Sequence, residues 1–141
     1  MKRISLLAAA TAAGALIAST AASAHLGPSK TITIIHAMRG CHVWQLAGHR
    51  PVQTLTITVK AGTTLRFVND DVMPHKLIEQ KGPKLTLFRP NMNHTSAVAA
   101  ADLDRRGTYR FTTKPGEDYP SMPEMHTIGE DYVLHLTVHV K

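Results

Sequence analysis

Strict alternation of apolar and polar residues is the feature that most constrains this chain. From Thr54 to Lys60, leucine, isoleucine and valine alternate with threonine and lysine. From Leu134 to Lys141, leucine and valine alternate in the same way with histidine, threonine and lysine. A period of two places successive side chains on opposite faces of an extended strand. Both segments are therefore predicted to be strands that each bury one face.

Shorter segments with strand-like composition lie before and between these two. Glycine, proline or aspartate residues separate them, which is typical of a chain that turns after each strand. Ala97 to Arg106 is the stretch predicted to form one helical turn, because alanine and leucine favour helices. Short strands without internal repeats predict an all-β sandwich. Further strands are expected at residues 31–36, 63–69, 75–79, 95–99 and 108–113.

The first 24 residues have the features of a secretory signal peptide. A basic start is followed by the apolar run from Ile4 to Ile17 and by the cleavage motif Ala22-Ser23-Ala24. We expect cleavage near Ala24 and export to the periplasm, the cell envelope or the medium. The mature chain is then one domain of residues 25–141, or 141 − 24 = 117 residues. No later segment is long and apolar enough to predict a membrane span.

The charge balance of the chain is modestly basic. Lysine and arginine number 16 against 10 acidic residues, and loss of Lys2 and Arg3 with the leader leaves 14 against 10. The basic residues are spread along the sequence, and no basic cluster with interleaved aromatic residues is present. Nucleic acid is therefore not an expected partner.

Cys41 is the only cysteine in the chain. In an exported protein a single cysteine forms an intermolecular disulfide, stays a free thiol or binds a metal. All nine histidines lie after residue 24, and several methionines accompany them in expected loops. Thiolate, imidazole and thioether together form a ligand set that suits copper.

The segment Asn69 to Leu77 has the sequence NDDVMPHKL. It resembles the cupredoxin segment in which a strand ends in Asn-x-Asp, a turn passes through proline and a copper-binding histidine follows. The resemblance implies that His75 is a metal ligand, held in position because proline stiffens the turn. The alternative is a turn histidine without a ligand role.

The segment Gly107 to Thr113, with the sequence GTYRFTT, carries a second resemblance. Cupredoxins have Gly-x-Tyr-x-Phe-x-Cys here, followed by a loop with a histidine and a methionine. The resemblance implies a Greek-key β-sandwich of the cupredoxin type with about seven to eight strands. The loop of residues 115–131 supplies Met125 and His126 as expected ligands, with Met122 as a replacement. Thr113 stands where the resemblance requires a cysteine.

Cys41 is the candidate for the missing thiolate. It lies in Ala37 to Trp44, which we expect to be a loop between the first two strands at the metal end of a cupredoxin. The alternative is a small buried apolar residue, because free cysteines are often buried. His42 is a further candidate ligand, provided that the chain bends there, since adjacent side chains of an extended chain point in opposite directions. His36 is expected either to contact a metal ligand without binding the metal itself or, preferably, to be a core histidine.

The predicted function is an exported copper-binding protein that transfers single electrons through a mononuclear site. The expected ligands are Cys41, His75 and His126, with Met125 as a weak axial ligand. His42 and Met122 are the alternative ligands. A redox or copper-transfer protein is the expected partner, and no catalytic triad or carboxylate pair predicts an enzyme. Two alternatives remain: a copper carrier or buffer with a His/Met site and no redox role, and a metal-free binding sandwich. Cysteine and histidine also bind zinc.

Overall fold

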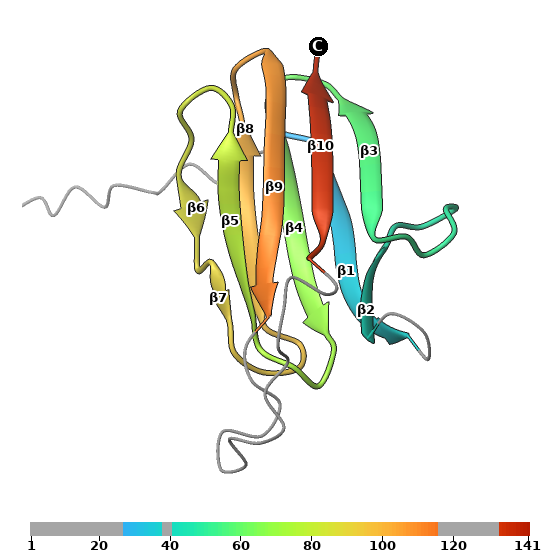
Figure 1. The fold of residues 1–141 in the computed structure, drawn as a ribbon. Coiled ribbons are helices and arrows are strands. Elements are labelled where there is room, and N and C mark those ends of the chain that lie inside the picture. Colours follow the sequence, from blue (N-terminus) through green and yellow to red (C-terminus); the bar gives the residue numbers. More distant parts are fainter. Residues whose placement is uncertain (1–26, 38–40, 116–132) are drawn as a thin grey trace, which may run out of the picture.

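The computed structural model describes residues 27–37, 41–115 and 133–141, which fold into two facing β-sheets (Figure 1). No helix is present in these residues. None of the described segments therefore meets the length and hydropathy that a membrane-spanning helix requires. The strands are β1 (Ser29–Ala37), β2 (Cys41–Gln45), β3 (Thr54–Val59), β4 (Thr63–Asp70), β5 (His75–Lys81), β6 (Leu87–Phe88), β7 (Asn91–Met92), β8 (Val98–Leu103), β9 (Gly107–Pro115) and β10 (His135–Val140).

Each sheet has five strands. One has the order β2-β1-β4-β8-β6, and the other, which is the nearer layer in Figure 1, has the order β3-β10-β9-β5-β7. The pairs β1–β4 and β3–β10 are parallel, and the other neighbouring pairs are antiparallel. The all-β sandwich expected from the sequence is confirmed. The described residues contain ten strands rather than seven or eight, partly because β6 and β7 are two-residue strands.

The core lies between the two sheets and follows the alternation in the sequence. In β3 every second residue is buried, as the pattern from Thr54 predicts. The rings of Trp44 and Phe67, and of Phe67 and Phe111, lie 6.0 and 5.7 Å apart between their centroids. Trp44 Nε1 also donates a hydrogen bond of 3.1 Å to the backbone oxygen of His135. This contact ties β2 to the start of the last strand.

The helical turn expected in Ala97 to Arg106 is wrong. This segment contains strand β8, which pairs with β4 and β6. Ala99, Ala101 and Leu103 are fully buried, while the residues between them are partly exposed. Burial of one face of a strand therefore outweighs the helical preference of alanine.

The loop expected around Cys41 is also wrong. Residues 41–45 form strand β2, an antiparallel partner of β1 in which Ala37 lies opposite Cys41 and His36 opposite His42. A valine and a tryptophan in this segment favour an extended chain, and both are buried. The backbone of Cys41 is therefore part of the sheet.

Candidate metal centre

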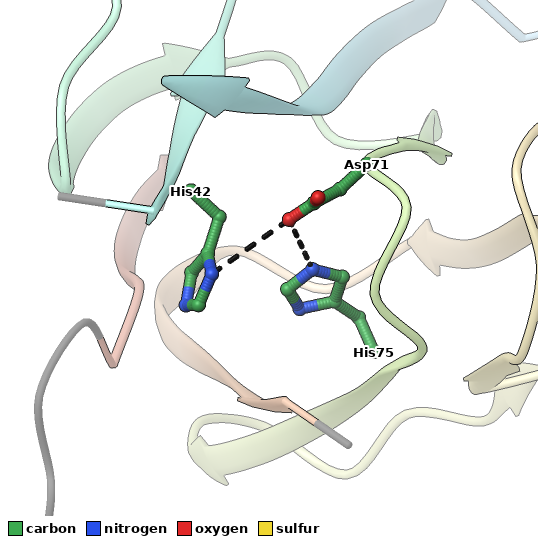
Figure 2. Close-up of side chains that lie close together, drawn as sticks. All are labelled: His42, Asp71 and His75. Carbon is green, nitrogen blue, oxygen red and sulfur yellow. Dashed lines mark hydrogen bonds and ion pairs between the residues drawn. The ribbon is translucent and has the colours of Figure 1, made fainter. Parts of the chain in front are cut away.

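Three polar side chains meet at one end of the sandwich, the lower end in Figure 1. His42 comes from β2, Asp71 follows the last residue of β4, and His75 is the first residue of β5. Figure 2 shows one oxygen of the Asp71 carboxylate directed toward both imidazole rings. One ligand atom from each residue lies within 4.8 Å of the other two, and all three residues are buried. The fold thus brings together two imidazoles and one carboxylate from distant parts of the sequence.

The spacing of these atoms is close to that of ligands around one metal ion. Asp71 Oδ2 lies 3.0 Å from His75 Nε2 and 3.7 Å from His42 Nδ1. Two ligand atoms on a tetrahedral ion, each at about 2.0–2.2 Å from it, lie about 3.3–3.6 Å apart. The His42 and His75 rings are nearly perpendicular, with centroids 4.8 Å apart. Small side-chain shifts would therefore let these three residues share one ion.

Asn69 holds the turn that carries Asp71 and His75. Its side-chain nitrogen donates to the backbone oxygens of Met73 at 2.8 Å and Met92 at 3.1 Å. Its side-chain oxygen accepts the backbone N–H of Asp71 at 3.0 Å. Asn69 is fully buried, so these bonds are not shared with solvent. The asparagine therefore fixes the position of the carboxylate.

The carboxylate of Asp71 is surrounded by hydrogen-bond donors. Its Oδ1 accepts the backbone N–H of Met73 at 3.3 Å and lies 3.2 Å from His36 Nδ1, while its Oδ2 contacts His75. Burial alone would raise the pKa of Asp71. The hydrogen bonds from His75, Met73 and His36, together with the charge of His75, outweigh this effect and lower the pKa below its usual value. The group is thus an anion at neutral pH, ready to bind a cation.

His36 is not a core histidine, so the preferred expectation for it is wrong. Its side chain is 55% exposed and contacts Asp71 Oδ1. Ile32 and Ile34, on the same face of β1, are fully buried, but His36 lies where that strand reaches the rim. The contact with Asp71 fits the other expectation, that His36 contacts a metal ligand without binding the metal itself.

The sequence identified two of the three residues in this cluster. His75 and His42 lie in it, whereas Asp71 was not among the expected ligands. The signal for Asp71 was its place in the same Asn-x-Asp motif, four residues before His75. The side chain of Cys41, and all of Met122, Met125 and His126, lie outside the described residues, so their ligand roles stay predictions.

Thr113 occupies the inner face of β9 next to the cluster. It pairs with Leu77, two residues from His75, and Pro115 pairs with His75 itself. Directly paired residues share a face of the sheet, so Thr113 is a diagonal neighbour of His75. Thr113 is 1% exposed, and its hydroxyl has no hydrogen-bond partner in the part of the chain that the structure describes. A hydroxyl, not a thiol, therefore borders the site from β9.

No family model and no curated protein sequence matches this chain. Among solved structures, it is similar to an amicyanin variant in its Cu(I) form, at 14% identity and a TM-score of 0.39 over 79% of this chain and 82% of the other. A purple cupredoxin from Nitrosopumilus maritimus is similar at 18% identity and a TM-score of 0.42, over 77% of this chain and 98% of the other. A cysteine protease inhibitor from Entamoeba histolytica is similar at 9% identity and a TM-score of 0.41, over 82% of this chain and 100% of the other. These values are low, so the site is interpreted from this chain's own residues.

Proposed function

We propose that this chain is a cupredoxin-like protein that binds one copper ion and exchanges single electrons. The observation that carries the proposal is the convergence of His42, Asp71 and His75 at one buried point. Imidazole nitrogen and carboxylate oxygen both bind Cu(II), and imidazole also accepts Cu(I). A buried carboxylate is costly unless a positive charge accompanies it, and a metal ion supplies that charge.

The rigidity of the site supports electron transfer. Asn69 fixes the turn, β2 and β5 hold the two histidines, and none of the three side chains is more than 2% exposed. A bound copper ion would supply the redox couple, while the protein's part is to keep the ligands in place. Ligands that are already fixed need little rearrangement when the charge of the ion changes.

Further ligands are proposed from the sequence. Cys41 directly precedes His42, and Pro115, the register partner of His75, directly precedes the segment that contains Met122, Met125 and His126. We propose Cys41 and His126 as additional ligands and Met125 as a weak axial one, with Met122 as its replacement. Thiolate and thioether favour Cu(I) and would extend the site to both oxidation states.

Copper carriage without a redox partner is the second candidate. His36 favours it, because this exposed imidazole contacts the same carboxylate as the buried histidines. Such a side chain offers a first contact for an ion that enters from solvent or from another protein. Zinc competes with copper for two imidazoles and a carboxylate.

Metal titration tests the proposal. We expect purified protein to bind about one equivalent of copper more tightly than zinc, as monitored by metal analysis after dialysis. His75→Ala should weaken copper binding more than about 100-fold, beyond the loss typical of groups that only support a ligand. His49→Ala, at an exposed histidine in the connection between β2 and β3 and outside the cluster, is the matched control. Protein that retains no copper would favour the metal-free binding sandwich.

Absorption and EPR spectra separate the two copper functions. An intense visible band requires a Cu(II)–thiolate bond, so it would support electron transfer through Cys41. A weak visible absorption band together with tight copper binding would favour the copper carrier.

The remaining proposals concern the cell. We propose export after cleavage near Ala24, a redox or copper-transfer protein as partner, and no enzymatic activity. N-terminal sequencing of the protein from cell fractions tests export, since the mature chain should begin at His25.

A further inference from the structure

The outward face of the sheet β3-β10-β9-β5-β7 gathers basic residues that are spread along the sequence. Lys76 and Lys81 lie on β5, and Arg110 and Lys114 lie on β9, all four exposed. We call these four residues the basic face. The sheet that presents them is the nearer layer in Figure 1. Folding therefore creates a cationic surface that the sequence alone does not display.

The four residues form two pairs of like charges. Lys76 lies directly opposite Lys114, and Lys81 lies directly opposite Arg110. A β-bulge between Glu79 and Lys81 shifts the register and produces the second pair. Like charges directly opposite one another on neighbouring strands destabilise a sheet. The fold therefore tolerates a repulsion here that any bound anion would relieve.

No acidic side chain balances these charges within the sheet. The described residues of its five strands include one acid, Glu79, which lies opposite Phe111, a core residue, and so belongs to the inward face. None of the four basic-face residues forms an ion pair with another residue of the ranges 27–37, 41–115 and 133–141. Within the described part of the chain, no acidic side chain of this sheet's outward face offsets the charge of the basic face.

A hollow at one end of this face is lined by side chains that can bind an anionic group. Lys81, Thr108, Arg110 and His139 line it, and its volume is about 270 Å³. Thr108 Oγ1 and His139 Nδ1 lie 3.0 Å apart on neighbouring strands. An arginine beside a lysine can bind a carboxylate through several charge-assisted hydrogen bonds. The other pair of cations lies about 13 Å away, four residues along β9, so a ligand must carry more than one negative group to meet both.

We propose that the basic face is the docking surface for an acidic patch on a partner protein. The described strands present no phenylalanine, tyrosine or tryptophan on this face as a stacking platform for bases, which argues against single-stranded nucleic acid. The exposed large apolar residues of the described chain, Val72 and Phe88, lie outside these five strands, so nothing on this face inserts into a bilayer. Carboxylates spread over a protein surface match the spacing of the two pairs of cations. The proposal does not depend on a bound metal.

Binding to polyglutamate at low ionic strength tests the proposal. We expect the protein to bind it, and salt to weaken the complex. Replacing all four basic-face residues by glutamine should weaken binding about tenfold or more, because four exposed ion pairs are lost. The same variant should melt at the same or a higher temperature, since two repulsive pairs are removed. This melting temperature shows that the variant is folded.

A control variant separates the face from net charge. It replaces four exposed basic residues that lie outside these five strands: Arg50, Arg66, Lys84 and Arg106. We expect this variant to bind polyglutamate as the unmodified protein does. Equal weakening by both variants, or no binding of polyglutamate, would overturn the proposal. Tighter binding of single-stranded DNA or phosphatidylglycerol vesicles than of polyglutamate through this face would overturn it too, in favour of nucleic acid or membrane.

Discussion

His75 Nε2 lies 3.0 Å from Asp71 Oδ2, and both side chains are fully buried. Neither group is stable alone in such a place, because a buried charge without a partner is costly. The pair therefore requires a shared proton or a metal ion between the two atoms. This relationship makes the end of the sandwich a chemical site rather than a continuation of the core.

Asp71→Asn is predicted to weaken copper binding by about 10–100-fold or more. The amide keeps the size of the side chain but removes the negative charge that attracts the ion. Titration of metal-free protein with Cu(II) measures the effect. Asp70→Asn, at the exposed neighbouring residue, is the matched control and should leave the affinity unchanged. Equal losses in both variants would mean that Asp71 does not contact the metal.

Asn69→Ala is predicted to lower the free energy of unfolding by about 2–4 kcal/mol. The substitution leaves several buried backbone groups without their hydrogen-bond partner. Urea unfolding of metal-free protein measures the loss, and copper affinity should fall with it because the turn positions two ligands. Asn91→Ala, at an exposed asparagine of β7, should cost little. A stable Asn69→Ala protein would show that the turn is held by the proline and the strands alone.

Glu79→Gln is predicted to stabilise the protein at neutral pH. Burial raises the pKa of Glu79 above its usual value of 4.5, so the folded state binds the proton more tightly than the unfolded state does. The stability contributed by the protonated group is therefore present below that value and is lost as the pH rises through the raised pKa. Glutamine cannot ionise and avoids this loss. Thermal unfolding at about pH 7 and at about pH 3 should show a difference between the two proteins only at the higher pH.

Thr113→Val is predicted to leave stability unchanged or to raise it by up to about 1 kcal/mol, because the substitution removes a buried hydroxyl without a described partner. Thr63→Val provides the comparison, since the Thr63 hydroxyl donates a bond of 2.7 Å to the backbone oxygen of Lys60. That variant should lose about 1 kcal/mol. Urea unfolding distinguishes the two. A large loss for Thr113→Val would reveal a partner of its hydroxyl.

The strands were predictable from the sequence where alternation is strict. The segments at Thr54 and Leu134 required no other information, because a period of two fixes the buried face. The alanines of β8 fitted a helix equally well, and only contact with β4 and the core decided between the two. The strand at Cys41 was missed for a similar reason, since its pairing with β1 is what makes it a strand.

The site was predictable only in part. His75 follows a proline turn that can be recognised locally, whereas the role of Asp71 depends on His42, which is 29 residues away in the sequence. The basic face could not be predicted either. Its like-charge pairs arise from the register of β5 and β9 and from a bulge, and neither is visible in the order of the residues.

Cys41 is predicted to be a copper ligand, and its reactivity provides the test. Binding would keep the sulfur as a metal-bound thiolate and block its reaction with alkylating reagents. Cys41 is the single cysteine of the chain, so any alkylation reports on this residue alone. We expect iodoacetamide to modify the metal-free protein and to leave the copper-loaded protein unmodified, as measured by mass spectrometry.

The variant Cys41→Ser completes this test. It should lose any intense visible band, because the hydroxyl is a poor ligand for a soft ion. Zinc-loaded protein serves as the control for colour, since zinc has no redox chemistry and a filled d shell. Equal alkylation with and without copper, together with an unchanged spectrum of the serine variant, would exclude Cys41 from the site. Copper would then be held by His42, Asp71 and His75 with the remaining histidine and methionine candidates, which is the ligand set of the carrier.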